Sequence, residues 1–260
     1  MISLKFYCKK IISKLIRFGI VSQSGRNFLG RICVKGRGGG NKKNYRLIDF
    51  FRRINLSGKI LKILYDCNRT SYIALILYKN GLNSFIIATE NLKVNDYVYS
   101  GNLKFEISQK NIGWAVPIKN IGLFTIISNI ESFPYKGSVI ARAAGTSSLL
   151  IAKVKNNATL KLNSKWQMHV NVGCMATIGS NANSKHKYKV IGSAGKHRNL
   201  GFRPKVRGVA KNPCDHPHGG GNGKHSSPSV PLTAYGKPAK WTPTKVKLKD
   251  KIKKRLFKKF

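Results

Sequence analysis

The chain has 260 residues and carries 49 Lys and Arg against 8 Asp and Glu, a formal net charge of +41 at pH 7. A compact protein with that charge repels itself unless a polyanion neutralises it, so nucleic acid is the first candidate partner and an anionic membrane surface the second. No run approaches the roughly 18 to 20 apolar residues that a membrane-spanning helix needs, which disfavours the membrane. Hydrophobic residues still make up 42% of the chain, so it is not simply a disordered polycation.

The first 28 residues contain no acidic residue and place apolar side chains at helical spacing among lysines. A basic amphipathic segment of this kind is typical of a mitochondrial targeting sequence. Targeting sequences favour Arg, whereas this segment favours Lys, so a retained basic arm that binds RNA is an equal alternative. We assign residues 1–29 to a basic N-terminal arm.

Strand-like segments dominate the middle of the chain. In residues 30–113, runs rich in β-branched and aromatic residues, such as residues 72–78, alternate with turn signals, of which Asn80-Gly81 is the clearest. A second set of short runs, punctuated by Pro and Gly, fills residues 114–190. No helical pattern intervenes, so each set predicts a small antiparallel barrel and the whole chain an all-β fold.

The C-terminal residues 191–260 are rich in Gly, Pro, Lys and Arg, and apolar periodicity is lost from about Asn183. A segment of this composition cannot bury enough apolar surface to fold alone, so its structure should come from what it binds. We expect an extended basic tail whose cations contact phosphates and whose aromatic residues stack on bases. The cations are Lys196, Arg198, Arg203, Lys205, Arg207, Lys211, Lys224, Lys237 and Lys240, and the aromatic residues are Tyr235 and Trp241.

Three consecutive glycines, Gly38, Gly39 and Gly40, stand among cations near the N-terminus. The segment lacks the spacing of a Walker loop. Glycine nevertheless lets the backbone approach a phosphate chain closely and adopt positive φ, while neighbouring cations contact phosphate oxygens. A solvated flexible loop would have the same composition and is the alternative. The flanking cations are Lys35, Arg37, Lys42, Lys43 and Arg46.

A second glycine run follows an acid-histidine cluster, Asp-His-Pro-His-Gly-Gly-Gly, at residues 215–221. Three uses of this cluster are open: RNA contact by the imidazoles, a metal site completed by Cys214 or His225, and acid-base catalysis. RNA contact is favoured because no predicted strand or helix holds the histidines and nothing builds a dry pocket. The five cysteines contain no C-x-x-C pair, which disfavours a zinc ribbon or a disulfide framework. The residues assigned to RNA contact here are Asp215, His216, His218, Gly219, Gly220 and Gly221.

Several segments resemble a known family. Residues 207–223, RGVAKNPCDHPHGGGNG, closely resemble the signature of the large-subunit ribosomal protein L2 (uL2) family, and residues 25–50 are similar to its N-terminal Gly-rich segment. The pieces NIE, ARAAGTSSLL and CMATIG fall in the order and spacing that the family shows. The resemblance covers residues 24–243, nearly the whole chain.

The resemblance implies an OB-like barrel in residues 30–113 and an SH3-like barrel in residues 114–190, with the basic N- and C-terminal segments inserted into large-subunit rRNA. It implies a structural, non-enzymatic role near the peptidyl transferase centre, in subunit assembly, subunit association and tRNA placement. The expected partners are large-subunit rRNA, neighbouring ribosomal proteins and the small subunit across the subunit interface. No membrane, small-molecule substrate, metal site or intrinsic cofactor is expected, although Mg²⁺ held by the rRNA is compatible with this role. Arg142, within ARAAG, joins the expected rRNA-binding residues.

The chain departs from the family in three places. The segment before SGRN is shorter than the family's arm, residues 94–96 read VND rather than VGD, and the region after Gly223 diverges. The chain is also rich in Ile, Asn and Lys, whose codons are rich in A and T. Together with the basic N-terminus, these features indicate a mitochondrial ribosome in the mitochondrial matrix, with a plastid or a bacterial cytoplasm as the alternative.

Overall fold

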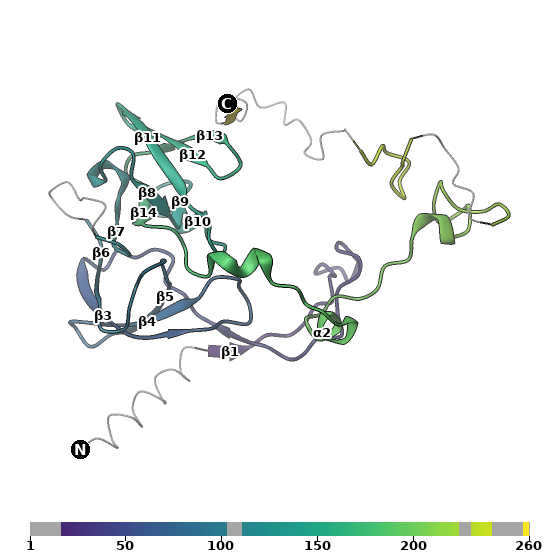
Figure 1. Ribbon diagram of the computed structural model, residues 1–260, viewed down its shortest axis with the longest axis horizontal. Coiled ribbons are helices and arrows are strands. Elements are labelled where there is room, and N and C mark those ends of the chain that lie inside the picture. Colours follow the sequence, from purple (N-terminus) through teal and green to yellow (C-terminus); the bar gives the residue numbers. More distant parts are fainter. Residues whose placement is uncertain (1–16, 103–110, 224–229, 241–256, 260) are drawn as a thin grey trace, which may run out of the picture. The chain divides into compact units, whose positions relative to one another are not determined.

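A computed structural model describes residues 17–102, 111–223, 230–240 and 257–259 (Figure 1). The chain divides into two compact units. Residues 1–20, 42–190 and 252–260 make up one, which we call the barrel unit. Residues 21–41 and 191–251 make up the other, the glycine-rich unit. The amphipathic segment considered as a targeting sequence falls mostly in residues 1–16 and so lies outside the described residues.

The described part of the barrel unit is built from short strands, which confirms the all-β prediction. Among the described residues of both units, helical structure is limited to one α-helix, α2 (Ala194–Asn199), and three 3₁₀ turns, η1 (Ile118–Asn120), η2 (Ser184–Tyr188) and η3 (Gly208–Ala210). None of the helices in the described ranges has the length and apolar character needed to cross a membrane. The strands are β1 (Arg17–Gly19), β2 (Asn44–Arg46), β3 (Leu56–Leu64), β4 (Ile73–Tyr78), β5 (Asn83–Ile87), β6 (Tyr97–Ser100), β7 (Ala115–Pro117), β8 (Ile126–Ser128), β9 (Ile130–Glu131), β10 (Ser138–Ile140), β11 (Ser148–Val154), β12 (Asn157–Leu162), β13 (Trp166–Asn171), β14 (Met175–Ile178) and β15 (Phe257–Lys259).

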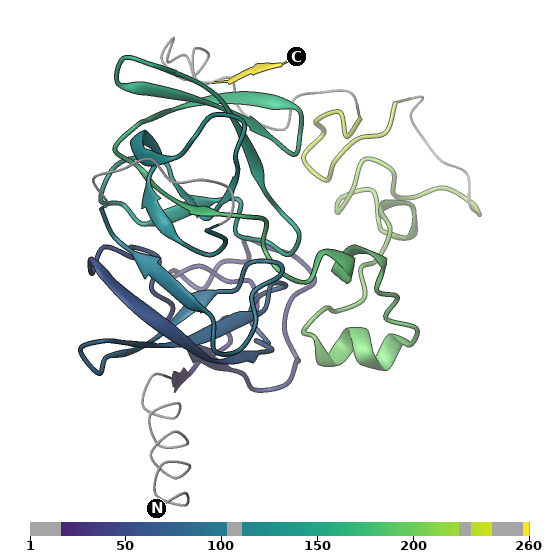
Figure 2. The ribbon, with the colours of Figure 1, turned by 60° about the vertical axis from the view of Figure 1, so that its left-hand side comes forward.

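Two antiparallel groups of strands form the barrel unit (Figure 2). In the first, the strand order is β6-β3-β4-β5, and in the second it is β15-β13-β12-β11-β8-β14-β7. A single parallel pairing, Ser100 in β6 with Ala115 in β7, joins the two groups into one sheet. Two short pairs, β1 with β2 and β9 with β10, lie apart from it. This arrangement agrees with an OB-like barrel followed by an SH3-like barrel.

The core of the first barrel is centred on β4. Its sequence, Ile-Ala-Leu-Ile-Leu-Tyr, is nearly continuous in apolar residues, and five of the six side chains are buried. A strand covered on both faces needs this pattern rather than strict alternation. Ile60, Ile76, Ile86 and Val98, one from each of the four strands, are packed together out of solvent.

The turn predicted at Asn80-Gly81 is confirmed. Gly81 has a φ of +83°, a left-handed conformation that glycine adopts without steric cost. The Leu82 amide donates to Asn80 Oδ1 (3.1 Å), and the Gly81 amide donates to the carbonyl of Tyr78 (2.9 Å). These bonds set the register of β4 against β5.

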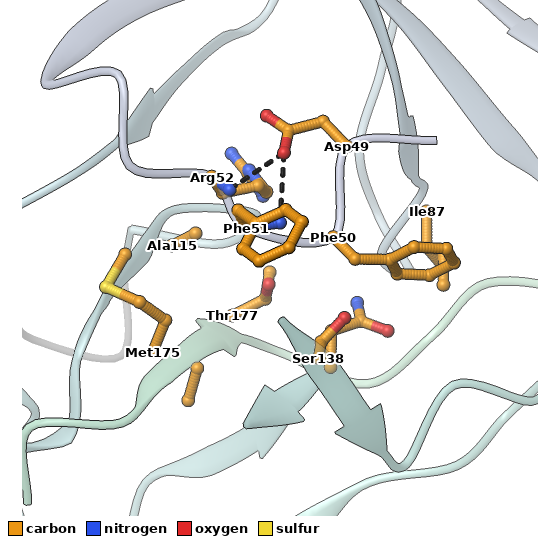
Figure 3. A pocket seen from close by; sticks show the side chains of 11 residues that line it. Asp49, Phe50, Phe51, Arg52, Ile87, Ala115, Ser138, Met175 and Thr177 are labelled. Carbon is orange, nitrogen blue, oxygen red and sulfur yellow. Dashed lines mark hydrogen bonds between the residues drawn. The ribbon is translucent and has the colours of Figure 1, made fainter. Parts of the chain in front are cut away.

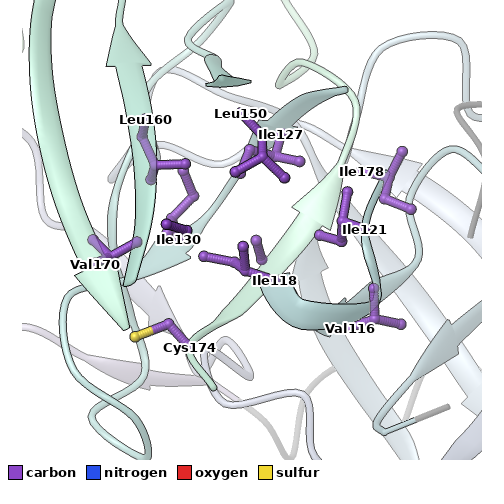
Figure 4. Close-up of a cluster of buried hydrophobic side chains, with 12 residues drawn as sticks. Val116, Ile118, Ile121, Ile127, Ile130, Leu150, Leu160, Val170, Cys174 and Ile178 are labelled. Carbon is purple, nitrogen blue, oxygen red and sulfur yellow. The ribbon is translucent and has the colours of Figure 1, made fainter. Parts of the chain in front are cut away.

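The core of the second barrel gathers branched aliphatic side chains (Figure 4). Ile118, Ile127 and Leu160 are fully buried, and each such side chain contributes about 1.5–3 kcal/mol by leaving water. The thiol of Cys174 lies at the edge of this cluster. Its burial, followed by the negative charge of Glu131, raises the pKa of Cys174 to about 11, so the thiol is neutral at physiological pH.

The linker between β2 and β3 makes a tight turn (Figure 3). Asp49 Oδ1 accepts hydrogen bonds from the backbone amides of Phe51 and Arg52, each 2.9 Å long. The carbonyl of Phe50 accepts from the amide of Ser138 in β10 (2.9 Å), which ties the linker to the second barrel.

Arg52 connects this turn to the place where the barrels meet. Its side chain is buried, and its guanidinium donates to Ser100 Oγ (2.9 Å) and to the carbonyls of Gly113 (2.9 Å) and Tyr99 (3.1 Å). Burial lowers the pKa of Arg52 from its ordinary value, but these acceptors satisfy a charge that would otherwise be costly to bury. The barrels are therefore joined through a hydrogen-bonded arginine as well as through β6 and β7.

Candidate nucleic-acid interface

The first glycine run is paired with a segment far along the chain. Residues 36–41 lie against residues 199–203, and both segments belong to the glycine-rich unit (Figure 1). An isolated antiparallel bridge links Arg37 with Phe202. Three backbone hydrogen bonds, each 3.0 Å, run from Gly38 N to Gly201 O, from Asn41 N to Asn199 O, and from Arg203 N to Gly36 O.

Two of the three glycines in this run are required by the protein's own packing. A Cβ on Gly40 would lie 2.7 Å from the Cα of Gly201, closer than any side chain can come. Gly38 has a φ of +120°, and a Cβ there would lie 2.8 Å from Ser24 Oγ. Gly39, with a φ of +67°, has no atom nearer than 3.9 Å to such a Cβ. Only Gly39 therefore offers open backbone to a ligand.

A hollow of about 490 Å³, which we call the basic hollow, lies beside this paired region. Its lining contains five cations and no carboxylate. The guanidinium of Arg37 lies 4.1 Å above the ring of Phe202, and that ring is stacked on His197 with a centroid distance of 4.5 Å. These two contacts hold the Arg37 guanidinium in a defined position in the lining. The cations lining the hollow are Lys35, Arg37, Arg198, Arg203 and Lys205.

Helix α2 supplies part of the hollow and is a departure from the predicted extended chain. Ser193 caps the helix, with its Oγ accepting from the amide of Lys196 (3.4 Å). Lys196, His197 and Arg198 occupy the last turn, where positive charge is favoured by the helix dipole. A helix of six residues with an internal glycine is too short to produce an apolar periodicity, so sequence patterns missed it.

The histidine loop, residues 207–221, is folded on itself. Turn η3 opens it, and the amide of Gly220 donates to the carbonyl of Lys211 (3.0 Å) to close it. A Cβ on Gly219 would lie 2.3 Å from the carbonyl oxygen of Asn212, and one on Gly220 would lie 2.5 Å from Pro213 Cγ. These two glycines are therefore needed for the loop's own closure. Gly221, with a φ of +84°, faces open space.

The two histidine rings act as hydrogen-bond acceptors within the protein. The amide of His218 donates to Nδ1 of His216 (3.0 Å), and the amide of Leu232 donates to Nε2 of His218 (2.9 Å). Desolvation, followed by the nearby charges of His218, Lys211 and Lys35, lowers the pKa of His216 below its usual 6.5. The His216 ring is therefore neutral at pH 7, and these two nitrogens are occupied.

The described residues bring together neither a metal site nor an Asp-His pair, and His225, considered above as a further metal ligand, lies outside them. In residues 17–102, 111–223, 230–240 and 257–259, no group of three His, Cys, Asp or Glu side chains is placed to hold a metal ion. The orienting contacts to His216 Nδ1 and His218 Nε2 come from backbone amides rather than from Asp215. The exposed thiols of Cys33, Cys67 and Cys214 are free.

The glycine-rich unit has almost no interior. Among its described residues, only Gly38 is buried, while apolar side chains such as Phe28 and Tyr235 are largely exposed. Its described residues contain twelve Lys and Arg, four in 21–41 and eight in 191–223 and 230–240, against one carboxylate, Asp215. A unit with that charge and no apolar core lacks the buried apolar surface that stabilises a globular fold.

In the barrel unit, each described carboxylate accepts an ion pair or a hydrogen bond from the protein itself. Asp66, fully buried, pairs with Arg46 (3.0 Å) and with Arg69. Glu131, also fully buried, pairs with Arg53 (2.8 Å). The other three accept hydrogen bonds. Asp49 accepts from the amides of Phe51 and Arg52, and Asp96 accepts from the amide of Lys93. Glu90 accepts from the hydroxyls of Ser180 and Ser184, which are distant in the sequence.

The predicted contact residues divide between the two units. Lys42, Lys43, Arg46 and Arg142 belong to the barrel unit, where Arg142 lies 5.0 Å above the ring of Phe50. The others that the structure describes belong to the glycine-rich unit. Five of its predicted cations line the basic hollow: Lys35, Arg37, Arg198, Arg203 and Lys205. Four others lie outside that lining: Arg207, Lys211, Lys237 and Lys240. Lys224 and Trp241 lie outside the described residues.

Sequence reasoning did not assign His197 and Phe202 to the interface. Neither residue stands in a motif, and each gains its place from the stack beneath Arg37. Both residues stand in a basic, glycine-rich stretch, close to cations in the sequence. That pattern of aromatic rings among cations is the signal from which their role could have been predicted.

Comparison with known proteins agrees with this geometry. Residues 13–100 match the family model for the ribosomal protein L2 RNA-binding N-terminal domain, and residues 111–236 match that for the L2 C-terminal domain. The large ribosomal subunit protein uL2 of Rhodospirillum rubrum is 43% identical over 235 residues, covering 90% of this chain and 82% of that protein. The uL2 of Rhodospirillum centenum is 44% identical (89% and 84% covered), and that of Phenylobacterium zucineum 43% (90% and 84%). The chain therefore belongs to the ribosomal protein L2 family, whose members are structural ribosomal proteins and not enzymes.

Proposed function

We propose that this chain is a structural protein of the large ribosomal subunit that binds rRNA chiefly through its glycine-rich unit. The observation that carries the proposal is the combination found there: twelve described cations against one carboxylate, with a single buried residue. Such a unit needs a polyanionic scaffold both to neutralise its charge and to fix its fold. The printed names of the bacterial relatives and of the matching RNA-binding domain support this role.

Glycines with free space around their backbone are the second element of the proposed binding mechanism. Gly39 and Gly221 combine a left-handed φ with free space, so an RNA backbone can approach the chain closely at these two points. The glycines beside them close the protein's own turns and hold these two positions in place. Cations around each point then contact phosphate oxygens, which positions the chain without reading a base sequence.

The location within the ribosome is a further part of the proposal. On its resemblance to the family signature, we place the histidine loop near the peptidyl transferase centre, where it supports subunit assembly, subunit association and tRNA placement without supplying catalytic groups. The partners are large-subunit rRNA, neighbouring ribosomal proteins and, at the interface, the small subunit. The division into an arm (1–29), two barrels (30–113 and 114–190) and a tail (191–260) belongs to the same proposal.

We also propose a mitochondrial ribosome as the particle that contains the chain. The basic N-terminus and the A/T-leaning residue usage support it, whereas the bacterial origin of the relatives is equally compatible with a bacterial cytoplasm. Fractionating the source cells into organelles and cytosol before isolating ribosomes distinguishes the two.

Sedimentation of a cell extract tests the main proposal. The chain is expected in the large-subunit fraction of a sucrose gradient and in complete particles, and it should leave them only at high salt. Recovery of the chain free of ribosomal particles would overturn the proposal. Equal affinity of the purified chain for duplex DNA and for structured rRNA at the same salt concentration would instead favour a general nucleic-acid-compacting role.

A further inference from the structure

The loop between β9 and β10, residues 132–137, exposes two aromatic rings that the interface described above does not include. Phe133 is 61% exposed and Tyr135 is 75% exposed. Tyr135 has a φ of +66°, a left-handed conformation that is unfavourable for a bulky residue. Strained residues of this kind persist where the surrounding structure holds them, often at sites that bind ligands.

A held cation covers one face of Tyr135. The guanidinium of Arg53 lies 4.0 Å from the centroid of the tyrosine ring. Arg53 Nη2 in turn donates to Glu131 Oε2 (2.8 Å), and that buried carboxylate also accepts from the amides of Gly137 (3.1 Å) and Met175 (2.9 Å). The cation and the end of the loop are thus fixed by one buried acceptor, and the ring presents its other face to solvent in a set orientation.

A hollow of about 390 Å³, which we call the tyrosine hollow, opens beside this ring. Its volume falls within the range of sites that hold small organic groups. The lining combines a ring and two prolines, which suit a flat apolar surface, with amide side chains and two cations, and it contains no carboxylate. The lining residues are Arg53, Asn55, Asn102, Pro117, Lys119, Pro134, Tyr135, Gly173 and Met175.

The charges around the hollow indicate what kind of partner it fits. Lys119 lies in its lining, and Lys136 follows Tyr135 in the loop, with its ammonium 5.6 Å from the ring of Phe133. The carboxylate of Glu131 is neutralised by Arg53 and is fully buried. Cations beside exposed rings match the combination of phosphates and flat bases in single-stranded RNA, and they do not match an apolar protein segment.

We propose that the tyrosine hollow takes an unpaired RNA base, stacked on the exposed face of Tyr135, with the flanking phosphates beside Lys119 and Lys136. The contact lies in the barrel unit and adds a base-stacking site to the phosphate contacts of the glycine-rich unit. The inference rests on the proposed function, because it takes rRNA as the source of that base.

Cross-linking within intact particles tests the site directly. Purified large subunits containing the wild-type chain are irradiated with ultraviolet light, digested and analysed by mass spectrometry. The peptide that contains Tyr135 is expected to carry a nucleotide adduct. An adduct-free peptide, or a cross-link from Tyr135 to another protein chain, overturns the proposal in favour of an empty or protein-binding surface.

Two substitutions at the same position separate stacking from structure. Tyr135→Gly removes the ring and suits the left-handed φ, so the loop keeps its shape, while Tyr135→Phe keeps the ring. Chemical probing of rRNA in particles with Tyr135→Gly is expected to show one base becoming about tenfold more reactive, as the loss of one stacking contact predicts. Particles with Tyr135→Phe should match the wild type.

Tyr97→Ala is the matched control. Tyr97 is also an exposed tyrosine with a cation near its ring, Lys59 at 6.0 Å, but it does not line the tyrosine hollow. The control is expected to leave the affected base unchanged. Identical reactivity in Tyr135→Gly and wild-type particles overturns the base site alone, whereas absence of the wild-type chain from large subunits overturns the proposed function.

Discussion

The amide of Leu232 donates a 2.9 Å hydrogen bond to Nε2 of His218, fourteen residues earlier in the chain. The amide of His218 makes the corresponding bond to Nδ1 of His216 at 3.0 Å. Both rings are therefore acceptors, and a protonated imidazole has no acceptor left to offer. The bond between the His218 amide and His216 Nδ1 consequently depends on a neutral His216 ring.

Acidification is expected to weaken the hydrogen bond between the His218 amide and the His216 ring. The pKa of His216 is lowered in the folded loop by desolvation and by neighbouring positive charge, so the opened loop binds the proton more readily. The stabilisation is complete above the opened-loop pKa of about 6.5 and is lost as the pH falls through the lower folded value. Hydrogen exchange of the His218 amide, followed from pH 7.5 to pH 5, should accelerate beyond the intrinsic pH trend.

His216→Asn provides the control for this titration. Asparagine keeps an acceptor near the position of Nδ1 and has no proton to bind in this pH range. Its exchange rates should follow the intrinsic trend alone. If the wild-type His218 amide were equally protected at pH 5 and pH 7.5, the proposed dependence on a neutral His216 ring would be wrong.

Replacing Gly219 with valine should impair incorporation into the large subunit more than replacing His218 with glutamine. A Cβ at Gly219 meets the carbonyl oxygen of Asn212 at 2.3 Å, so the loop cannot close, and we expect a cost of at least about 2 kcal/mol. Glutamine still offers an acceptor to the amide of Leu232. The amount of each variant in gradient-purified particles measures the effect.

Gly195→Ala serves as the matched substitution in the same unit. Gly195 lies in α2, and a Cβ there has nothing within 4 Å, so alanine should be neutral or slightly stabilising. Normal incorporation of a Gly219→Val chain alongside reduced incorporation of a His218→Gln chain would contradict the account of the loop given above.

Binding of the purified chain to structured rRNA should weaken steeply with salt. A slope of log affinity against log salt near −0.7 per neutralised phosphate gives about −7 for roughly ten contacts. Changing Arg203 and Lys205, both in the lining of the basic hollow, to glutamine should reduce the slope by about 1.4. Filter binding or fluorescence anisotropy between 50 and 400 mM salt measures these slopes.

Lys79→Gln is the corresponding control for the salt experiment. Lys79 is an exposed cation in the turn after β4, outside the basic hollow. Its loss should leave the slope nearly unchanged. A double variant of Arg203 and Lys205 with the wild-type slope would show that the basic hollow does not contact phosphates.

The rate of alkylation should distinguish Cys174 from the exposed cysteines. The pKa of Cys174 is raised to about 11, so only about one thiol in a thousand is ionised at pH 8, and the side chain is buried as well. Cys33, Cys67 and Cys214 are exposed and should react with iodoacetamide in the native chain, whereas Cys174 should react only after denaturation. Peptide mass spectrometry reads each site, and equal rates at Cys67 and Cys174 would contradict the buried second core.

The sequence alone was sufficient to predict those features of this protein that depend on neighbouring residues or on the overall composition. Runs of β-branched residues predicted the strands, Asn80-Gly81 predicted the turn between β4 and β5, and the charge imbalance predicted a polyanionic partner. Each of these follows from local backbone preferences, burial or composition, which act over a few residues or over the chain as a whole.

Only the tertiary structure decided which distant residues meet and what each glycine is for. The pairing of residues 36–41 with 199–203 builds the basic hollow, and the contact of Gly219 with Asn212 makes that glycine part of a closed loop. The stack of Arg53, in the linker between β2 and β3, on Tyr135, in the loop after β9, depends on the buried carboxylate of Glu131. Such contacts join segments with no shared periodicity, because they are set by the path of the chain through space rather than by the preferences of adjacent residues.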